Sequence, residues 1–169
     1  MDTDTDRQRV VQWGDPTISS SAARTLSGRA FLEGMRDGTL PPPPFVSNVG
    51  LHFAEIGDGL VVFTLEPRED LYNGIGIVHG GVTATLCDSA AGCAVTSITA
   101  PGEVAVTLDL SVRYFLPIDA SVGTLRCEGR VISRSRNYAT AEARVFDASG
   151  NIHAHATSTL AITRPGAKR

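Results

Sequence analysis

The sequence predicts an α+β domain in which an antiparallel sheet wraps around one long central helix. The chain has 169 residues, 42% of them hydrophobic and 20% charged, which suits a single globular domain. Two short apolar runs precede one long run of small residues, and three or four alternating runs follow it. Successive strands of this kind pair with their neighbours as antiparallel strands, and the single helix then covers one face of the sheet.

The first 44 residues are expected to form an N-terminal extension. Residues 1–16 are predicted to be disordered, and residues 17–38 to form one helix with serine N-caps and a glycine stop. The four prolines at 41–44 must be extended and cannot be helical. We therefore place a joint there, and assign residues 45–169 to the main domain.

The main domain is predicted to begin with a hairpin. Val49–Ile56 and Leu60–Glu66 read as short strands, and Gly57-Asp58-Gly59 between them is a hairpin signal. A glycine-rich loop, residues 73–76, follows. Gly80 and Gly81 then open the segment that ends at Ser97, whose length favours a helix. Its side chains are small nearly all round, which predicts an enclosed helix.

The strand predicted over Val104–Phe115 has the clearest alternation of the chain. Val106 and Leu108 would lie on its apolar face with Leu110 and Val112, and Thr107 on its polar face. Three more strands complete the sheet, and they are expected over Val122–Ser133, Tyr138–Phe146 and Ile152–Thr163. A turn at residues 147–151 joins the last two.

Composition excludes several function classes. The net charge of −3 gives no electrostatic reason for a nucleic-acid or anionic-membrane partner, and no apolar run reaches the ~20 residues of a membrane helix. The one lysine, Lys168, lies next to the last residue, so the body of the chain offers no phosphate-binding, Schiff-base or general-base lysine. The three cysteines have no zinc spacing, and the start has no signal-peptide pattern. These observations predict a cytoplasmic protein.

Two features of the predicted helix point to chemistry. Asp88 is the only acid between Asp70 and Glu103, and an enclosed carboxylate is costly unless something satisfies or uses it. Gly80 and Gly81 present backbone N–H groups at the helix N-terminus, where a developing negative charge is stabilised. The plain alternatives are a solvated helix stripe for Asp88 and a tight turn for the glycines.

Geometry restricts how these two features can act together. Gly80 and Asp88 are eight residues apart, which is about 12 Å along a helix axis. One carbonyl group cannot contact both within a single chain. If both act on one substrate atom, a second subunit supplies one of them. Two antiparallel helices related by a two-fold axis would form two equivalent sites.

Asn73, His79-Gly80-Gly81 and Asp88, on a loop leading into a central helix, resemble the hotdog-fold acyl-CoA thioesterases of the phenylacetate-degradation (PaaI-like) type. The resemblance covers about residues 45–163. It implies a hotdog fold, a homodimer with a continuous sheet and shared active sites, and a tetramer made of two dimers. It also implies an acyl-CoA substrate, and hydrolysis without a metal or cofactor.

The resemblance also implies roles for individual residues. Asp88 matches the catalytic carboxylate, which attacks the thioester carbonyl or activates a water. Gly80 matches the residue whose N–H polarises the carbonyl oxygen from the other subunit. Asn73 and His79 match the loop residues that hold this arrangement in place. Thr107 matches a serine or threonine near the water, although strict alternation turns it away from Val106.

Further residues are candidates for substrate contacts. Gly81 shares the helix N-terminus with Gly80, and Arg134 and Arg136 lie in a turn between strands. Their guanidinium groups suit the phosphates of CoA, while the plain alternative is a solvated hairpin tip.

Other interpretations have weaker support. Gly74 and Gly76 begin a dinucleotide-binding pattern whose third glycine would fall on His79. His153 and His155 alternate on one strand, but no third metal ligand accompanies them. Cys87 fits a small buried filler better than a nucleophile. Two other functions on this fold stay open, namely a non-catalytic acyl-CoA-binding module and an enoyl-CoA hydratase or dehydratase. The N-terminal helix is either a lid or a passive surface helix.

Overall fold

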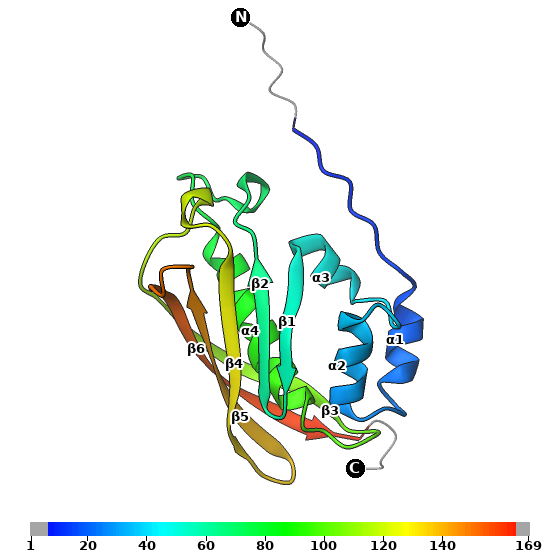
Figure 1. Cartoon of the computed structure of the whole chain (residues 1–169). Coiled ribbons are helices and arrows are strands. Elements are labelled where there is room, and N and C mark those ends of the chain that lie inside the picture. The colour runs from blue at the N-terminus through cyan, green and yellow to red at the C-terminus, as the bar shows by residue number, and fades with distance from the viewer. Residues whose placement is uncertain (1–6, 165–169) are drawn as a thin grey trace, which may run out of the picture.

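A computed structural model describes residues 7–164, and it confirms the predicted α+β hotdog architecture. A six-stranded antiparallel sheet wraps around the 17-residue helix α4 (Gly80–Thr96), as Figure 1 shows. The strands are β1 (Leu51–Gly57), β2 (Leu60–Leu65), β3 (Val104–Tyr114), β4 (Leu125–Arg134), β5 (Tyr138–Phe146) and β6 (Ile152–Thr163). Their order across the sheet is β1-β2-β4-β5-β6-β3, so β1 and β3 form its two edges. The prediction that successive strands pair was wrong for β3, which pairs with β6, while β4 pairs with β2.

Small residues allow α4 to pack close to the sheet. The inner faces of β5 and β6 present mainly alanines, and Ala141, Ala143 and Ala154 are fully buried. Gly129 of β4 approaches most closely, since a Cβ atom placed there would lie 2.1 Å from the backbone oxygen of Ala90. Helix α4 is enclosed as predicted, because small side chains on both the helix and the inner face of the sheet let the two pack closely.

A β-bulge in β3 overturns the predicted alternation of that strand. Thr107 pairs with Leu160 of β6, but Asp109 pairs with the very next residue, Thr159, so Leu108 has no partner. The extra residue reverses which side chains face α4. Thr107 therefore shares the inner face with Leu110, whereas Val106 lies outside and is 51% exposed.

The N-terminal extension contains two helices where one was predicted over residues 17–38. α1 (Pro16–Ala22) is capped by Asp15, whose carboxylate accepts the N–H of Thr17. The predicted helix is interrupted after α1, and Ser27 caps α2 (Gly28–Arg36). The serine N-caps expected at the start of the helix were therefore wrong. Residues 1–6, part of the predicted disordered start, lie outside the described residues.

The proline run also differs from its prediction at one end. Pro44 is not extended but begins α3 (Pro44–Val49), where a proline fits because the first helical residue needs no N–H partner. The helix ends at Gly50, whose φ of 85° is the left-handed conformation that favours glycine. The strand predicted from Val49 therefore starts two residues later, at Leu51.

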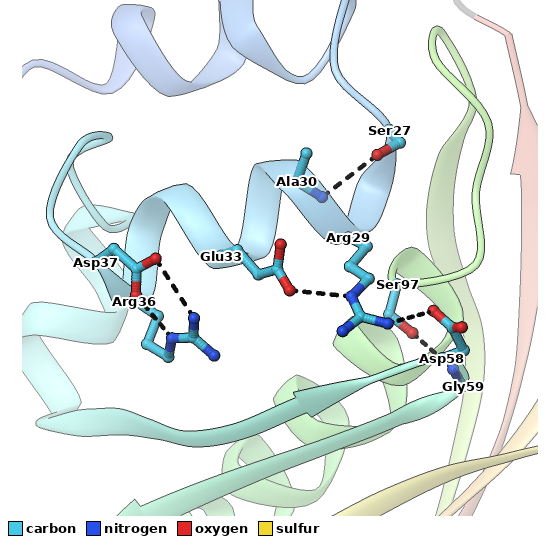
Figure 2. A network of polar contacts seen from close by, with 9 residues as sticks. All are labelled: Ser27, Arg29, Ala30, Glu33, Arg36, Asp37, Asp58, Gly59 and Ser97. Atoms are coloured by element: carbon cyan, nitrogen blue, oxygen red, sulfur yellow. Dashed lines mark hydrogen bonds and ion pairs between the residues drawn. The ribbon is translucent and has the colours of Figure 1, made fainter.

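The extension is fixed to the main domain at several points. The backbone of Gly28 touches the end of α4 so closely that a Cβ atom would lie 1.7 Å from the Thr96 oxygen. Arg29 pairs with Glu33 and with Asp58 of the β1–β2 hairpin, both at 2.9 Å (Figure 2). Ser97, just after α4, accepts the N–H of Gly59 in that hairpin. Together these contacts join α2, the hairpin and α4 into one packed unit.

Two short 3₁₀ helices, η1 (Glu69–Leu71) and η2 (Ala120–Val122), lie in the loops beside the N-terminal end of α4. Within residues 7–164, no helix has the length and apolar character needed to cross a membrane.

The close approach of α4 to β4 leads to a stability prediction. Gly129→Ala should lower the free energy of unfolding by about 3 kcal/mol, because the new methyl group meets helix backbone that cannot rotate away. Gly57→Ala is the matched control, since its methyl group would meet Leu60 at an ordinary 3.7 Å. Urea unfolding measures both variants. Equal stability of the two would contradict this account of the packing.

Candidate active site

The loop before α4 is held by the side chain of Asn73. Its Oδ1 atom accepts the N–H groups of Ile75 at 3.0 Å and Ile77 at 3.4 Å. The backbone N–H of Asn73 also donates to the oxygen of Ile77 at 2.8 Å. Asn73 therefore closes a tight loop that delivers the chain to the helix N-terminus.

His79 is the N-cap of α4. Its Nδ1 atom accepts the N–H of Gly81 at 2.9 Å, and its backbone N–H donates to the backbone oxygen of Leu71. Nδ1 is thus the acceptor, which leaves Nε2 to carry the proton of the neutral ring. The N–H of Gly81 is occupied by this contact, so Gly81 is not a free donor for a substrate.

Gly80 differs from Gly81 in this respect. None of the hydrogen bonds found within residues 7–164 uses the Gly80 N–H. Its carbonyl oxygen accepts the hydroxyl of Tyr114 at 2.9 Å, and the Tyr114 ring lies against its Cα. The first amide of α4 is therefore unpaired and held in position by an aromatic residue that the sequence analysis did not single out.

Asp88 lies two turns further along α4, where its side chain is half-buried. Its Oδ1 atom accepts a hydrogen bond from the Thr107 hydroxyl at 2.8 Å. The bulge at Leu108 makes this contact possible, because it turns Thr107 to the face that packs on the helix. The prediction that strand alternation directs Thr107 away from the site was wrong.

A cavity of about 280 Å³ lies beside the N-terminus of α4. Gly80 and Tyr114 form part of its lining, and residues 115–118 form one wall. Asp88 is not among the lining residues. Within one chain, therefore, the unpaired Gly80 amide borders the cavity and the Asp88 carboxylate does not.

The two candidate arginines have different surroundings. Arg134 is exposed but is held by contacts within the chain, since it donates to the Ile98 oxygen and to Glu103 at 2.7 Å. The N–H of Ala100, with Arg134 and Arg164 nearby, holds the pKa of Glu103 below its usual value. Arg136 at the hairpin tip is exposed and has no ion pair within residues 7–164. Arg136 is thus the more available of the two for an anionic ligand.

The histidines and cysteines considered from the sequence are not arranged as a metal or thiol site. His155 contacts Glu142 at 3.0 Å, whereas His153 contacts Asp147 and Pro117. Residues 7–164 contain no cluster of three His, Cys, Asp or Glu side chains suited to a metal ion. Cys87 is fully buried, as its proposed role as a filler requires. Burial, with Asp88 as the second cause, raises the pKa of Cys93 to about 12.

Comparison with known proteins identifies the family to which this fold and its central helix belong. The chain belongs to the thioesterase superfamily, whose sequence model matches residues 75–154. A Halobacterium salinarum protein named as an esterase is 33% identical over 118 residues, which are 66% of this chain and 76% of that protein.

Two solved structures are also similar. A mutant of the phenylacetic acid degradation protein PaaI of Thermus thermophilus is 29% identical, with a TM-score of 0.64 over 70% of this chain and 98% of that one. A Streptococcus mutans protein with bound acetyl-CoA is 30% identical, with a TM-score of 0.62 over 68% and 89% of the two chains. The resemblance to PaaI-like hotdog thioesterases is therefore confirmed.

The cap formed by His79 can be tested through stability. His79→Ala should lower the free energy of unfolding by about 1 kcal/mol, because the Gly81 N–H loses its acceptor. His79→Asn should retain most of that stability, since asparagine is a strong N-cap residue. Urea unfolding distinguishes the three proteins. If the alanine variant were as stable as the wild type, the cap would not stabilise α4.

Proposed function

We propose that the protein hydrolyses an acyl-CoA thioester to a free acid and CoA. Membership of the thioesterase superfamily supports thioester hydrolysis in general. The observation that supports Asp88 as the working carboxylate is its hydrogen bond with Thr107 on a helix otherwise made of small and apolar residues. The unpaired N–H of Gly80 is the hydrogen-bond donor proposed to polarise the thioester carbonyl.

The proposed reaction uses these groups in a simple order. The thioester oxygen accepts the Gly80 N–H at the positive end of the α4 dipole, which stabilises the charge that develops there. Asp88 either attacks the carbonyl carbon directly or takes a proton from a water that attacks it. When water attacks, the carbon–sulfur bond breaks and the proton held by Asp88 passes to the sulfur, so that the acid and the CoA thiol leave. When Asp88 attacks, the same bond breaks to give a CoA thiolate and a mixed anhydride on Asp88; a water then cleaves the anhydride to the acid, and a proton of that water neutralises the thiolate. Thr107 keeps the carboxylate pointed at the reacting carbon.

Two subunits are needed to bring these groups together. Strand β3 is an edge strand, and Leu108 and Tyr114 on it are 57% and 54% exposed. An unpaired edge of this kind is a template for pairing with another chain. Antiparallel pairing of two β3 strands would extend the sheet across a homodimer and set the two α4 helices side by side. Asp88 of each subunit would then face Gly80 of the other.

The cavity beside Gly80 suggests the size of the acyl group. Its lining is mainly apolar and includes Ile77, Leu116 and Ile118. A cavity of about 150 Å³ is known to hold benzene, so about 280 Å³ has room for one ring with a short linker, or for a short chain. We propose acyl-CoA substrates of this size, with Arg136 as a contact for the CoA phosphates.

Thiol release from acetyl-, hexanoyl-, benzoyl- and phenylacetyl-CoA tests this function. Asp88→Asn should lower kcat at least about 100-fold on the best substrate, as expected when a general base or nucleophile is removed. Asp58→Asn is the matched control and should behave as the wild type, because Asp58 is an exposed hairpin residue paired with Arg29.

Two outcomes would contradict the proposal. Equal rates for the wild type and Asp88→Asn would remove Asp88 from the mechanism. Saturable binding of these acyl-CoAs to the wild type without any thiol release would favour a non-catalytic binding module on the same fold.

A further inference from the structure

His153 lies at the start of β6, where it is 2% exposed. The sequence analysis considered it only as half of a metal pair with His155, which contacts Glu142 instead. A buried histidine needs hydrogen-bond partners for both ring nitrogens, because a buried nitrogen without a partner lowers the stability of the fold. Where these partners lie therefore shows what the ring holds together.

The two ring nitrogens contact two different segments. Nδ1 lies 3.1 Å from the backbone oxygen of Pro117, and Nε2 lies 3.3 Å from Oδ2 of Asp147. The backbone oxygen of Pro117 can only accept a hydrogen bond, so the ring donates from Nδ1, and Nε2 faces the Asp147 carboxylate. Hydrogen bonds, first from Asn151 and also from His153, lower the pKa of Asp147 to about 2, so its side chain is a carboxylate.

The segment on the Nδ1 side is the wall of the cavity beside Gly80. The backbone oxygen of His153 accepts the N–H groups of Phe115 at 2.8 Å and Leu116 at 3.4 Å. With the ring bond to Pro117, one residue thus holds three successive wall residues. The wall continues into the site, because the oxygen of Ile118 accepts the N–H of Val78, just before the α4 N-cap.

We propose that His153 is a positioning residue for the substrate cavity, and that its ring holds the Phe115–Ile118 wall against β6 through the bond to Pro117. The inference rests on the proposed function, since it takes this cavity as the place where part of the acyl-CoA binds. His153 does not line the cavity, so it acts through the wall and not on the reacting atoms. Loss of the ring bond to Pro117 should therefore weaken substrate binding and leave the chemical step intact.

Two substitutions of similar size separate the two ring contacts. Asparagine can present its amide N–H where Nδ1 stood and keep the Pro117 bond, but it is too short to reach Asp147. Glutamine can present its amide where Nε2 stood and keep the Asp147 bond, but it loses Pro117. His153→Gln should therefore raise KM about five-fold with kcat within two-fold, whereas His153→Asn should keep KM within two-fold of the wild type.

His155→Gln is the matched control, since the same change on the same strand affects only the contact with Glu142, which the glutamine amide can keep in place of Nε2. It should leave both KM and kcat unchanged. The thiol-release assay with the best of the four acyl-CoAs named above measures all three variants. Equal KM values for His153→Gln and His153→Asn, or a fall in kcat alone, would overturn the proposal.

A readout without substrate keeps this test separate from the proposed function. Hydrogen exchange of the peptide that contains residues 115–118 should be at least about five-fold faster in His153→Gln than in His153→Asn. If the wild type released no thiol, the proposed function would fail while this exchange measurement still reported on the wall. Equal exchange in the two variants would show that the ring does not hold the wall.

Discussion

A rigid helix keeps Gly80 and Asp88 eight residues apart, and this spacing determines how a site that uses both has to be built. A straight α-helix of that length cannot fold back on itself, because its backbone hydrogen bonds fix the rise at about 1.5 Å per residue. The unpaired amide and the carboxylate are therefore about 12 Å apart along α4 in any one chain. A thioester that contacts both must lie between two chains.

The rest of the structure serves to present this helix. Alanines on β5 and β6 and Gly129 on β4 let the sheet wrap closely around one side of α4. The side that carries Asp88 remains half-open and borders the edge strand β3. The bulge at Leu108 reverses the faces of that strand and gives the carboxylate its partner. Close packing on one side thus leaves the functional groups on the other.

The sequence predicted the features that depend on local pattern. The succession of elements along the main domain, the long helix and the hairpin at Gly57-Asp58-Gly59 follow from periodicity and turn residues, and all were confirmed. The place of β3 in the sheet could not be predicted in this way, because its pairing with β6 joins segments distant in the sequence. The face of Thr107 could not be predicted, because a bulge depends on pairing with β6 and leaves no mark on the alternation of β3 itself. The break between α1 and α2 depends in the same way on the contact of Gly28 with the end of α4.

Only part of the candidate site could be predicted, again because some of its contacts join residues distant in the sequence. Asp88 and the glycine pair stand out in the sequence because they are an isolated acid and a helix start. Tyr114 and His153 do not stand out, since their importance comes from the carbonyl groups of Gly80 and Pro117, which are distant in the sequence. The sequence also does not show that the His79 ring accepts the Gly81 N–H and leaves the Gly80 N–H unpaired.

Subunit complementation tests the proposed shared site most directly. Gly80→Pro removes the amide but suits the first helical position, and Gly80→Ala keeps the amide as its control. Asp88→Asn and Gly80→Pro chains, each inactive alone, are unfolded together in equal amounts and refolded. Half of the dimers are then mixed, and each mixed dimer has one intact site, so thiol release should recover to roughly one quarter of the wild-type rate. A mixture as inactive as its two components would show that each site lies within one chain.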